Sequence, residues 1–180
     1  MAIYTVFESV NMGSTHYAER IFDAVCENPV ENGTFGYLEG LADGYSHIYK
    51  FVPGFKAGAD VVVVDHPAWN FDTCRITNQR RDQYVNEAGV PFRVRIVKDN
   101  DEFGITAEGF TPATRESAEV DKYLAIDATG KLAVSDAAAE DAVMVAKIMR
   151  KRLTGGAIST PIRSYGRICM IYEAKVESLA

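Results

Sequence analysis

The chain has 180 residues, of which 47% are hydrophobic and 24% are charged, so it can bury a core without disulfides or metals. Its formal net charge of -6 makes nucleic acid an unfavourable partner, because an acidic protein and a polyanion repel each other. The apolar runs are far shorter than the roughly 20 residues of a membrane-spanning helix, and the first residues lack a secretory pattern, so we expect a cytoplasmic protein with no membrane partner.

Short strand patterns begin near the N-terminus. Runs rich in β-branched and aromatic residues alternate with turn pairs such as Asn32-Gly33 and Asp43-Gly44, which is typical of small antiparallel strands. These runs are Val6-Phe7 and residues 34–38, 48–52 and 60–64. Residues 16–26 have some helix propensity, but the turn that follows at 31–33 favours an extended conformation, which we predict.

One short helix is predicted in the middle of the chain, over residues 76–88. Tyr84 and Val85 interrupt a polar run there, and Gly89 suits the position just after a helix.

A β-hairpin is predicted directly after this helix, over residues 92–107. Apolar and polar residues alternate before and after a turn at 99–101, with a period of two. The apolar positions are Phe92, Val94, Ile96, Phe103 and Ile105. We expect this hairpin to lie in the core sheet.

The C-terminal third continues the strand pattern. Strands are predicted at 123–126 and 131–134 around a turn at 127–130, and a long last strand at about 162–176. Residues 137–150 have helical composition, yet their β-branched residues also suit a buried strand, and we predict a loop followed by a strand.

The predicted fold is therefore mainly β, a small antiparallel barrel or sandwich with one short helix. Residues 1–15 are predicted to form an extended N-terminal arm, because the stretch after Phe7 is polar and contains glycine. Residues 16–180 then form a single β-rich domain, with a possible sub-division near 112–118.

The sequence contains no recognised catalytic motif: no phosphate loop, no His-Glu-x-x-His and no Gly-x-Ser-x-Gly. Cys74 with His47 or His66 is a candidate thiolate–imidazole pair, but no spacing fixes their proximity. Asp65 and His66 are adjacent in a strand pattern and would point to opposite faces. Three widely spaced cysteines indicate neither disulfides nor a cysteine-rich metal site. We predict no catalytic, cofactor-binding or metal site.

Residues 99–102 contain three carboxylates and an asparagine, like a fragment of a calcium loop. The ligand spacing of an EF-hand is missing, so a turn is the better interpretation.

Two sets of residues are candidates for contact with a protein partner. The first is an apolar strip at the N-terminus, which could add to a foreign sheet edge. The second is a basic cluster in an otherwise acidic chain, which either docks on carboxylates of a partner or is a solvated face. The sets are Ile3, Tyr4, Val6 and Phe7, and Lys147, Arg150, Lys151 and Arg152. A smaller group, Arg75, Arg80 and Arg81, has the same two interpretations.

The order of segments resembles that of small head proteins encoded beside the major capsid proteins of tailed bacteriophages. Residues 30–38, 41–44 and 49–53 look like their N-terminal half, and residues 86–89 leading into 92–96 and 103–109 look like their hairpin. Residues 123–134, 145–148 and the last strand resemble their C-terminal barrel pattern. The resemblance covers nearly the whole chain and consists of strand and turn patterns, without a functional signature.

This resemblance implies a non-enzymatic capsid decoration (cement) protein, which binds the outside of the assembled shell and stabilises it. The implied partners are the major capsid protein and other copies of the chain, and the implied location is the virion exterior after assembly in the host cytoplasm. Two alternatives remain open. One is a tail or head-completion structural protein, and the other is a small-ligand-binding or hydrolytic β-barrel that uses His47, His66 or Cys74.

Overall fold

The computed structural model describes residues 3–15, 20–68, 81–154 and 169–179. Within these ranges the regular secondary structure is mainly β, with short 3-10 turns between strands. The strands are β1 (Phe7–Asn11), β2 (Ile21–Val25), β3 (Phe35–Leu41), β4 (Ile48–Pro53), β5 (Val62–Val64), β6 (Phe92–Ile96), β7 (Glu102–Thr106), β8 (Tyr123–Ile126), β9 (Leu132–Ser135), β10 (Met144–Thr154) and β11 (Cys169–Leu179). The 3-10 helices are η1 (Gly13–Thr15), η4 (Arg81–Gln83), η5 (Ala107–Gly109) and η6 (Arg115–Ser117).

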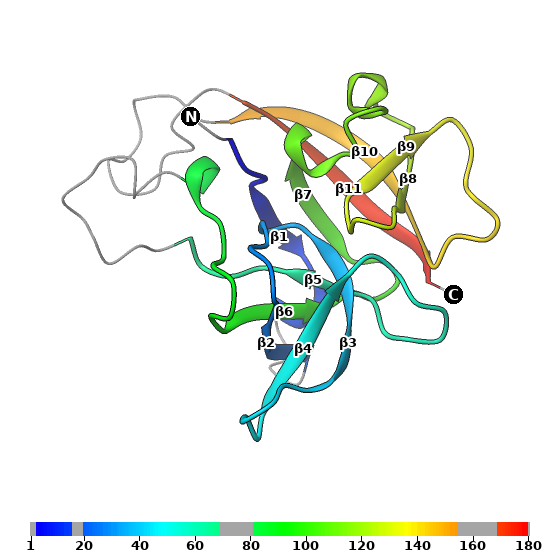
Figure 1. Cartoon of the computed structure of the whole chain (residues 1–180). Helices are drawn as coiled ribbons and strands as arrows, with labels where there is room; N and C mark the ends of the chain where they lie inside the picture. Colours follow the sequence, from blue (N-terminus) through cyan, green and yellow to red (C-terminus); the bar gives the residue numbers. More distant parts are fainter. Residues whose placement is uncertain (1–2, 16–19, 69–80, 155–168, 180) are drawn as a thin grey trace.

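The strands form two sheets. One is an antiparallel six-stranded sheet in the order β1-β7-β11-β10-β8-β9, and the other is a closed barrel in the order β2-β4-β3-β5-β6. Figure 1 shows the long β10 and β11 crossing the upper part of the molecule, with the barrel below them. Within the barrel only β2 and β4 pair in parallel. The predicted mainly β fold with a small barrel is confirmed.

Strand β5 and the residue before it lie between the core of the barrel and the core of the six-stranded sheet. Val62 and Val64 pack in the barrel core, whereas Val61 and Val63 pack in the core of the six-stranded sheet. Because alternate residues of a strand point to opposite faces, a run of four buried valines is what a strand with two buried faces requires. The two sheets are therefore parts of one packed body.

Phenylalanines fill the junction between the two sheets. Phe35 of the barrel lies with its ring centroid 5.5 Å from that of Phe103 and 6.5 Å from that of Phe7. Phe7 and Phe103 stack at 5.8 Å. All three rings are buried, so barrel and sheet share one aromatic core.

The turn between β8 and β9 docks directly on the barrel. The backbone N–H of Phe35 donates to the carbonyl of Gly130 at 2.8 Å. Gly130 has φ of +81°, and a Cβ at this position would lie 2.3 Å from the carbonyl oxygen of Phe35. Only glycine meets both the positive φ and the close approach.

The predicted strands in the C-terminal third are confirmed within the described residues. Strands β8 and β9 pair as an antiparallel hairpin around the predicted turn, and the loop predicted to lead into a strand over 137–150 ends at β10. The first part of the predicted last strand, residues 162–168, lies outside the described residues, and β11 covers the rest.

The predicted hairpin over residues 92–107 is wrong, although both of its strands exist. Strand β6 pairs with β2 and β5 in the barrel, and β7 pairs with β1 and β11 in the other sheet. The turn between them is fixed by Asp101, whose carboxylate accepts from the backbone N–H of Lys98 at 2.9 Å and of Gly13 at 2.8 Å. Alternation predicted two strands correctly but carries no information on which strands pair.

The helix predicted over residues 76–88 is wrong where the structure describes it. Residues 76–80 lie outside the described residues, and the rest contains only the 3-10 turn η4. Asn86 instead bridges to Val30 through backbone hydrogen bonds in both directions, at 2.9 and 3.0 Å. Its side-chain amide also donates to the Val30 carbonyl and to Asn32 Oδ1. These long-range bonds hold the segment extended.

The described N-terminal segment contains the strand β1 and ends in the 3-10 turn η1, and it is not a separate arm. Strand β1 pairs with β7 at the edge of the six-stranded sheet, and Phe7 and Met12 belong to the sheet core. Both the backbone N–H and the hydroxyl of Thr5 donate to the Glu31 carboxylate, at 2.9 and 2.6 Å. The polar composition after Phe7 reflects the exposed side of an edge strand.

Residues 112–118 do not separate two cores. Ala118 is buried in the same cluster as Phe110 and Leu132. The Thr114 hydroxyl accepts a hydrogen bond from the backbone N–H of Val134 at 3.1 Å. This segment therefore covers the outer edge of β9.

Candidate functional site

A groove lies at one end of the barrel. It has a volume of about 530 Å³, and its walls come from the end of β2, the outer part of β3, and β4. A second hollow of about 300 Å³ continues it along β4, sharing Cys26, Glu27, Glu39 and Lys50. The groove is bordered by a hairpin that Figure 1 shows extending to the bottom of the view.

Strand pairing explains why the groove forms here. Strand β2 ends at Val25, which is paired with Lys50 of β4, so residues 26 and 27 leave the barrel beside Lys50. On the other side the pairing of β3 with β4 is interrupted between Leu38 and Leu41, where Gly40 has φ of +139°. This bulge interrupts the regular ladder before pairing resumes at Leu41, and the groove is lined by the residues that follow β2 and by those around the bulge.

The hairpin that borders the groove is closed by local hydrogen bonds. The backbone N–H of Ala42 donates to the Ile48 carbonyl at 2.8 Å, and that of Tyr45 donates to the Ala42 carbonyl at 3.1 Å. Gly44 supplies the positive φ of +82° that the turn needs. The turn predicted at Asp43-Gly44 is therefore confirmed, and it holds the side chains around it in place.

Charge in the groove is mainly negative. Lys50 Nζ lies 3.0 Å from Glu27 Oε1, and both side chains are exposed to solvent. The hydrogen bond and charge of Glu27 raise the pKa of Lys50, with smaller contributions from Glu39 and Asp43. Lys50 therefore stays positive, and its positive charge is shared by several carboxylates.

Apolar side chains stand beside these charges. Leu41 is 55% exposed and Tyr45 is 41% exposed, although both line the groove. Large apolar side chains exposed next to a hollow are a common feature of protein contact surfaces. By contrast, the Cys26 thiol at the base of the groove is buried and free.

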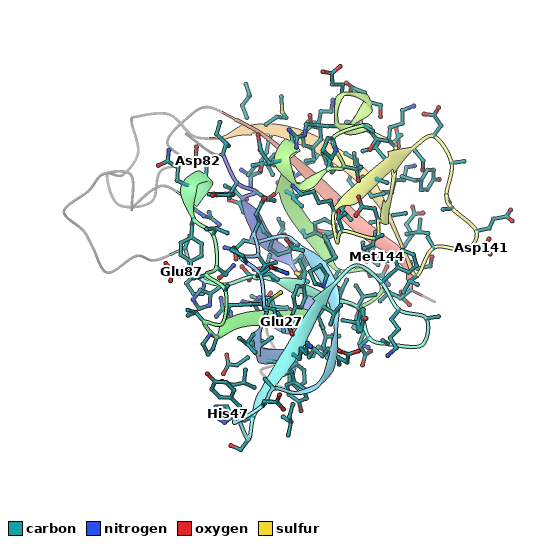
Figure 2. All side chains as sticks on the ribbon, viewed as in Figure 1. Glu27, His47, Asp82, Glu87, Asp141 and Met144 are labelled. Carbon is teal, nitrogen blue, oxygen red and sulfur yellow. The ribbon has the colours of Figure 1, made fainter. Side chains whose placement is uncertain are left out.

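The two described histidines lie in different surroundings. His47 stands at the tip of the β3–β4 hairpin (Figure 2), where its Nδ1 lies 3.2 Å from the Ser46 hydroxyl. His66 accepts a hydrogen bond at Nδ1 from the backbone N–H of Arg93 at 3.1 Å and stacks on Tyr84 at 6.2 Å. Burial and the charge of Arg93 lower the pKa of His66, which keeps its ring neutral. Neither histidine lines the groove, and Cys74 lies outside the described residues.

Asp65 is held by arginines on the neighbouring strand. Its carboxylate accepts from Arg95 Nε at 2.5 Å and lies 4.0 Å from Arg93. Like Asp101 in the turn, it is satisfied by hydrogen bonds of the chain itself. In the part of the chain that the structure describes, no group of three or more His, Cys, Asp or Glu residues could hold a metal ion.

The predicted basic cluster lies on β10, and each of its four cations is paired within the chain. Lys147 lies 3.0 Å from Asp121 and Lys151 lies 2.5 Å from Glu119. Arg150 pairs with Glu173, and Arg152 bridges Glu173 and Glu8. Their charges are largely matched by the chain's own carboxylates.

The two glutamates that bind Arg152 belong to a row of paired residues across four strands. Glu8 of β1 lies opposite Gly104 of β7, which lies opposite Glu173 of β11, which in turn lies opposite Arg150 of β10. Gly104 leaves the row open between the two glutamates. Burial raises the pKa of Glu173. Hydrogen bonds from Arg152 and Arg150 together lower it by more than burial raises it, so the pKa of Glu173 lies below its usual range.

The predicted N-terminal contact residues differ in exposure. Val6 and Phe7 are each 2% exposed, so their side chains pack inside the chain itself and do not face a partner. Ile3 is 43% exposed, and the backbone N–H of Tyr4 donates to the Asp82 carbonyl at 2.8 Å. Ile3 and Tyr4 remain predictions as contact residues.

The groove residues were not identified as a site from the sequence. Glu27, Glu39, Asp43 and Lys50 are spread over 24 positions, and only the folded barrel brings them together. The one available signal was the Asp43-Gly44 turn, since turn residues between strands mark a hairpin tip.

The chain matches no family model, no curated protein and no solved structure in comparisons with known proteins. Among the described residues, no helix has the length and apolar character needed to cross a membrane.

Proposed function

We propose that the chain is a non-catalytic structural protein of a tailed-bacteriophage head, which binds the outer surface of the assembled capsid and stabilises it. The observation that carries this proposal is the groove at the end of the barrel, beside which Leu41 and Tyr45 are exposed. The resemblance of the segment order to capsid-associated proteins supplies the kind of particle. The partners are then the major capsid protein and neighbouring copies of this chain.

The composition of the groove favours contact over catalysis. A nucleophile needs an adjacent base, and the residues that line the groove include one thiol, which is buried, and no histidine. A stable protein interface instead needs apolar anchors within a complementary surface of roughly 1,600 Å². Exposed apolar side chains on the β3–β4 hairpin supply such anchors.

The edges of the six-stranded sheet are covered, which favours a protein whose copies do not associate with one another before they bind a capsid. Along β9, the Leu132 carbonyl accepts from the backbone N–H of Thr111 at 2.9 Å, and the N–H of Val134 donates to Thr114. Along β1, Arg81 donates to the Phe7 carbonyl at 2.9 Å. Covered edges resist strand pairing between copies, which favours a decoration protein over a tail protein that polymerises through its sheet edges.

Co-sedimentation with expanded capsids that lack the protein tests this proposal. We expect the purified chain to pellet with such capsids in a saturable way and to raise the temperature at which they break open. The double substitution Leu41→Ser with Tyr45→Ser removes the apolar anchors and should weaken binding while leaving the melting temperature of the free protein nearly unchanged.

Three outcomes would contradict the proposal. One is the absence of saturable binding to capsids, and another is assembly of the purified chain into rings or tubes by itself, as expected of a tail or head-completion protein. The third is a hydrolytic activity that disappears on substitution of His47, His66 or Cys74.

A further inference from the structure

The groove at the end of the barrel carries an unbalanced negative charge. Its lining contains three carboxylates, Glu27, Glu39 and Asp43, and one ammonium group, Lys50. Three negative charges against one positive charge leave a net charge of -2. Lys50 is already within 3.0 Å of Glu27, whereas neither Glu39 nor Asp43 forms an ion pair with any residue that the structure describes.

Several carboxylates elsewhere on the same chain are matched by cations of the chain itself. Glu8 and Glu173 on the six-stranded sheet share Arg152, and Asp65 is paired with Arg95. Glu119 and Asp121 are likewise paired with lysines of β10. In the groove, by comparison, two carboxylates that form no ion pair among the described residues line a hollow large enough to admit a side chain.

Apolar surface in the groove narrows the kind of partner that fits. Leu41 and Tyr45 stand within two residues of Asp43 on the same hairpin, and both are exposed. A simple inorganic cation would leave these side chains in water, and an uncharged apolar ligand would leave the carboxylates unmatched. A peptide segment that carries a cationic side chain next to an apolar one matches both features.

We propose that the groove binds an extended segment of a partner protein that presents lysine or arginine beside an apolar side chain. The cationic group lies between Glu39 and Asp43, and the apolar side chain packs on Leu41 and Tyr45. The inference rests on the proposed function in one respect: the segment is assigned to the capsid protein, because that protein is the proposed partner.

Peptide binding to the full chain tests the inference without capsids. The probe is a fluorescein-labelled hexapeptide of alternating lysine and valine, and its anisotropy is followed at low and physiological salt. One comparison peptide replaces lysine with glutamate, and another replaces valine with glycine. We expect the lysine–valine peptide to bind most tightly and its affinity to fall as salt rises, since exposed ion pairs are screened.

A matched pair of variants separates the groove from the overall negative charge. Glu39→Gln with Asp43→Asn removes two charges from the groove, whereas Glu140→Gln with Asp141→Asn removes two from the exposed β9–β10 connection. Figure 2 labels Asp141 at the right of the view, away from the hairpin tip marked by His47. We expect the groove variant to lose about tenfold in affinity, as two exposed ion pairs imply, and the control to bind like the original chain.

Equal weakening by both variants, or tight binding by the glutamate peptide, would overturn the inference. Unaltered melting curves for both variants confirm that any loss comes from the groove. If the peptide does not bind but the chain still co-sediments with capsids, the inference fails and the proposed function stands. If the peptide binds through the groove but capsids do not bind the chain, the groove has its predicted chemistry and the capsid assignment fails.

Discussion

Replacing Phe7 with alanine tests whether the N-terminal segment belongs to the core. Phe7 is 2% exposed and its ring lies 5.8 Å from Phe103 and 6.5 Å from Phe35. Truncation of a buried phenylalanine costs about 3 to 5 kcal/mol, against a total stability of about 5 to 15 kcal/mol for a domain. We therefore expect Phe7→Ala to remove about a fifth or more of the stability and to lower Tm by about 6 to 20 °C.

Urea denaturation followed by circular dichroism measures this loss. Val10→Ala is the control on the same strand, because Val10 is 41% exposed and its truncation should cost less than about 1 kcal/mol. A separable arm would make both substitutions equally mild. A free energy of unfolding for Phe7→Ala within about 1 kcal/mol of the value for Val10→Ala would thus refute the placement of β1 in the core.

Three further predictions follow from packing and charge. Gly130→Ala should lower the free energy of unfolding by at least about 3 kcal/mol, because the new Cβ would lie 2.3 Å from a carbonyl oxygen. Gly44 has a similar φ but open space around it, so Gly44→Ala should lower the free energy of unfolding by about 1 kcal/mol. Equal melting temperatures for the two variants would contradict this expectation. Val62→Ala and Val63→Ala should each cost roughly 1.5 to 3 kcal/mol, because both faces of β5 are buried; a large effect at only one position would indicate a half-buried strand. Because the pKa of Glu173 lies below its usual value of 4.5, its stabilisation is present above about pH 4.5 and is lost as pH falls through the lower, folded-state pKa. Glu173→Gln should therefore make Tm less dependent on pH in the acidic range, and an unchanged dependence would count against the ion-pair row.

Local patterns predicted most strands but not their partners. The four valines at 61–64 marked a strand, and the Asp43-Gly44 pair marked a turn, because both signals depend on neighbouring residues. The hairpin at 92–107 failed because β6 and β7 have the right alternation but enter different sheets. The helix at 76–88 failed within the described residues because the bonds that hold Asn86 extended come from residues 30 and 32.

The contact residues illustrate the same limit on the surface. The basic residues of β10 were recognisable as a cluster, but their pairing with Glu8 and Glu173 depends on strands more than 20 positions away. An apolar strip at the N-terminus has the same sequence pattern whether it binds a partner or packs in the chain's own core. Burial of Phe7 decides between these two, and only the tertiary structure supplies it.

An image reconstruction of the virion tests the proposal that the chain decorates the outside of a capsid. We expect many symmetry-related copies on the outer face of the head, with the β3–β4 hairpin and its groove turned toward the shell. Difference density against heads assembled without the protein should have the size of this fold. Absence from the head, a position inside the shell, or density confined to the tail would refute the proposal.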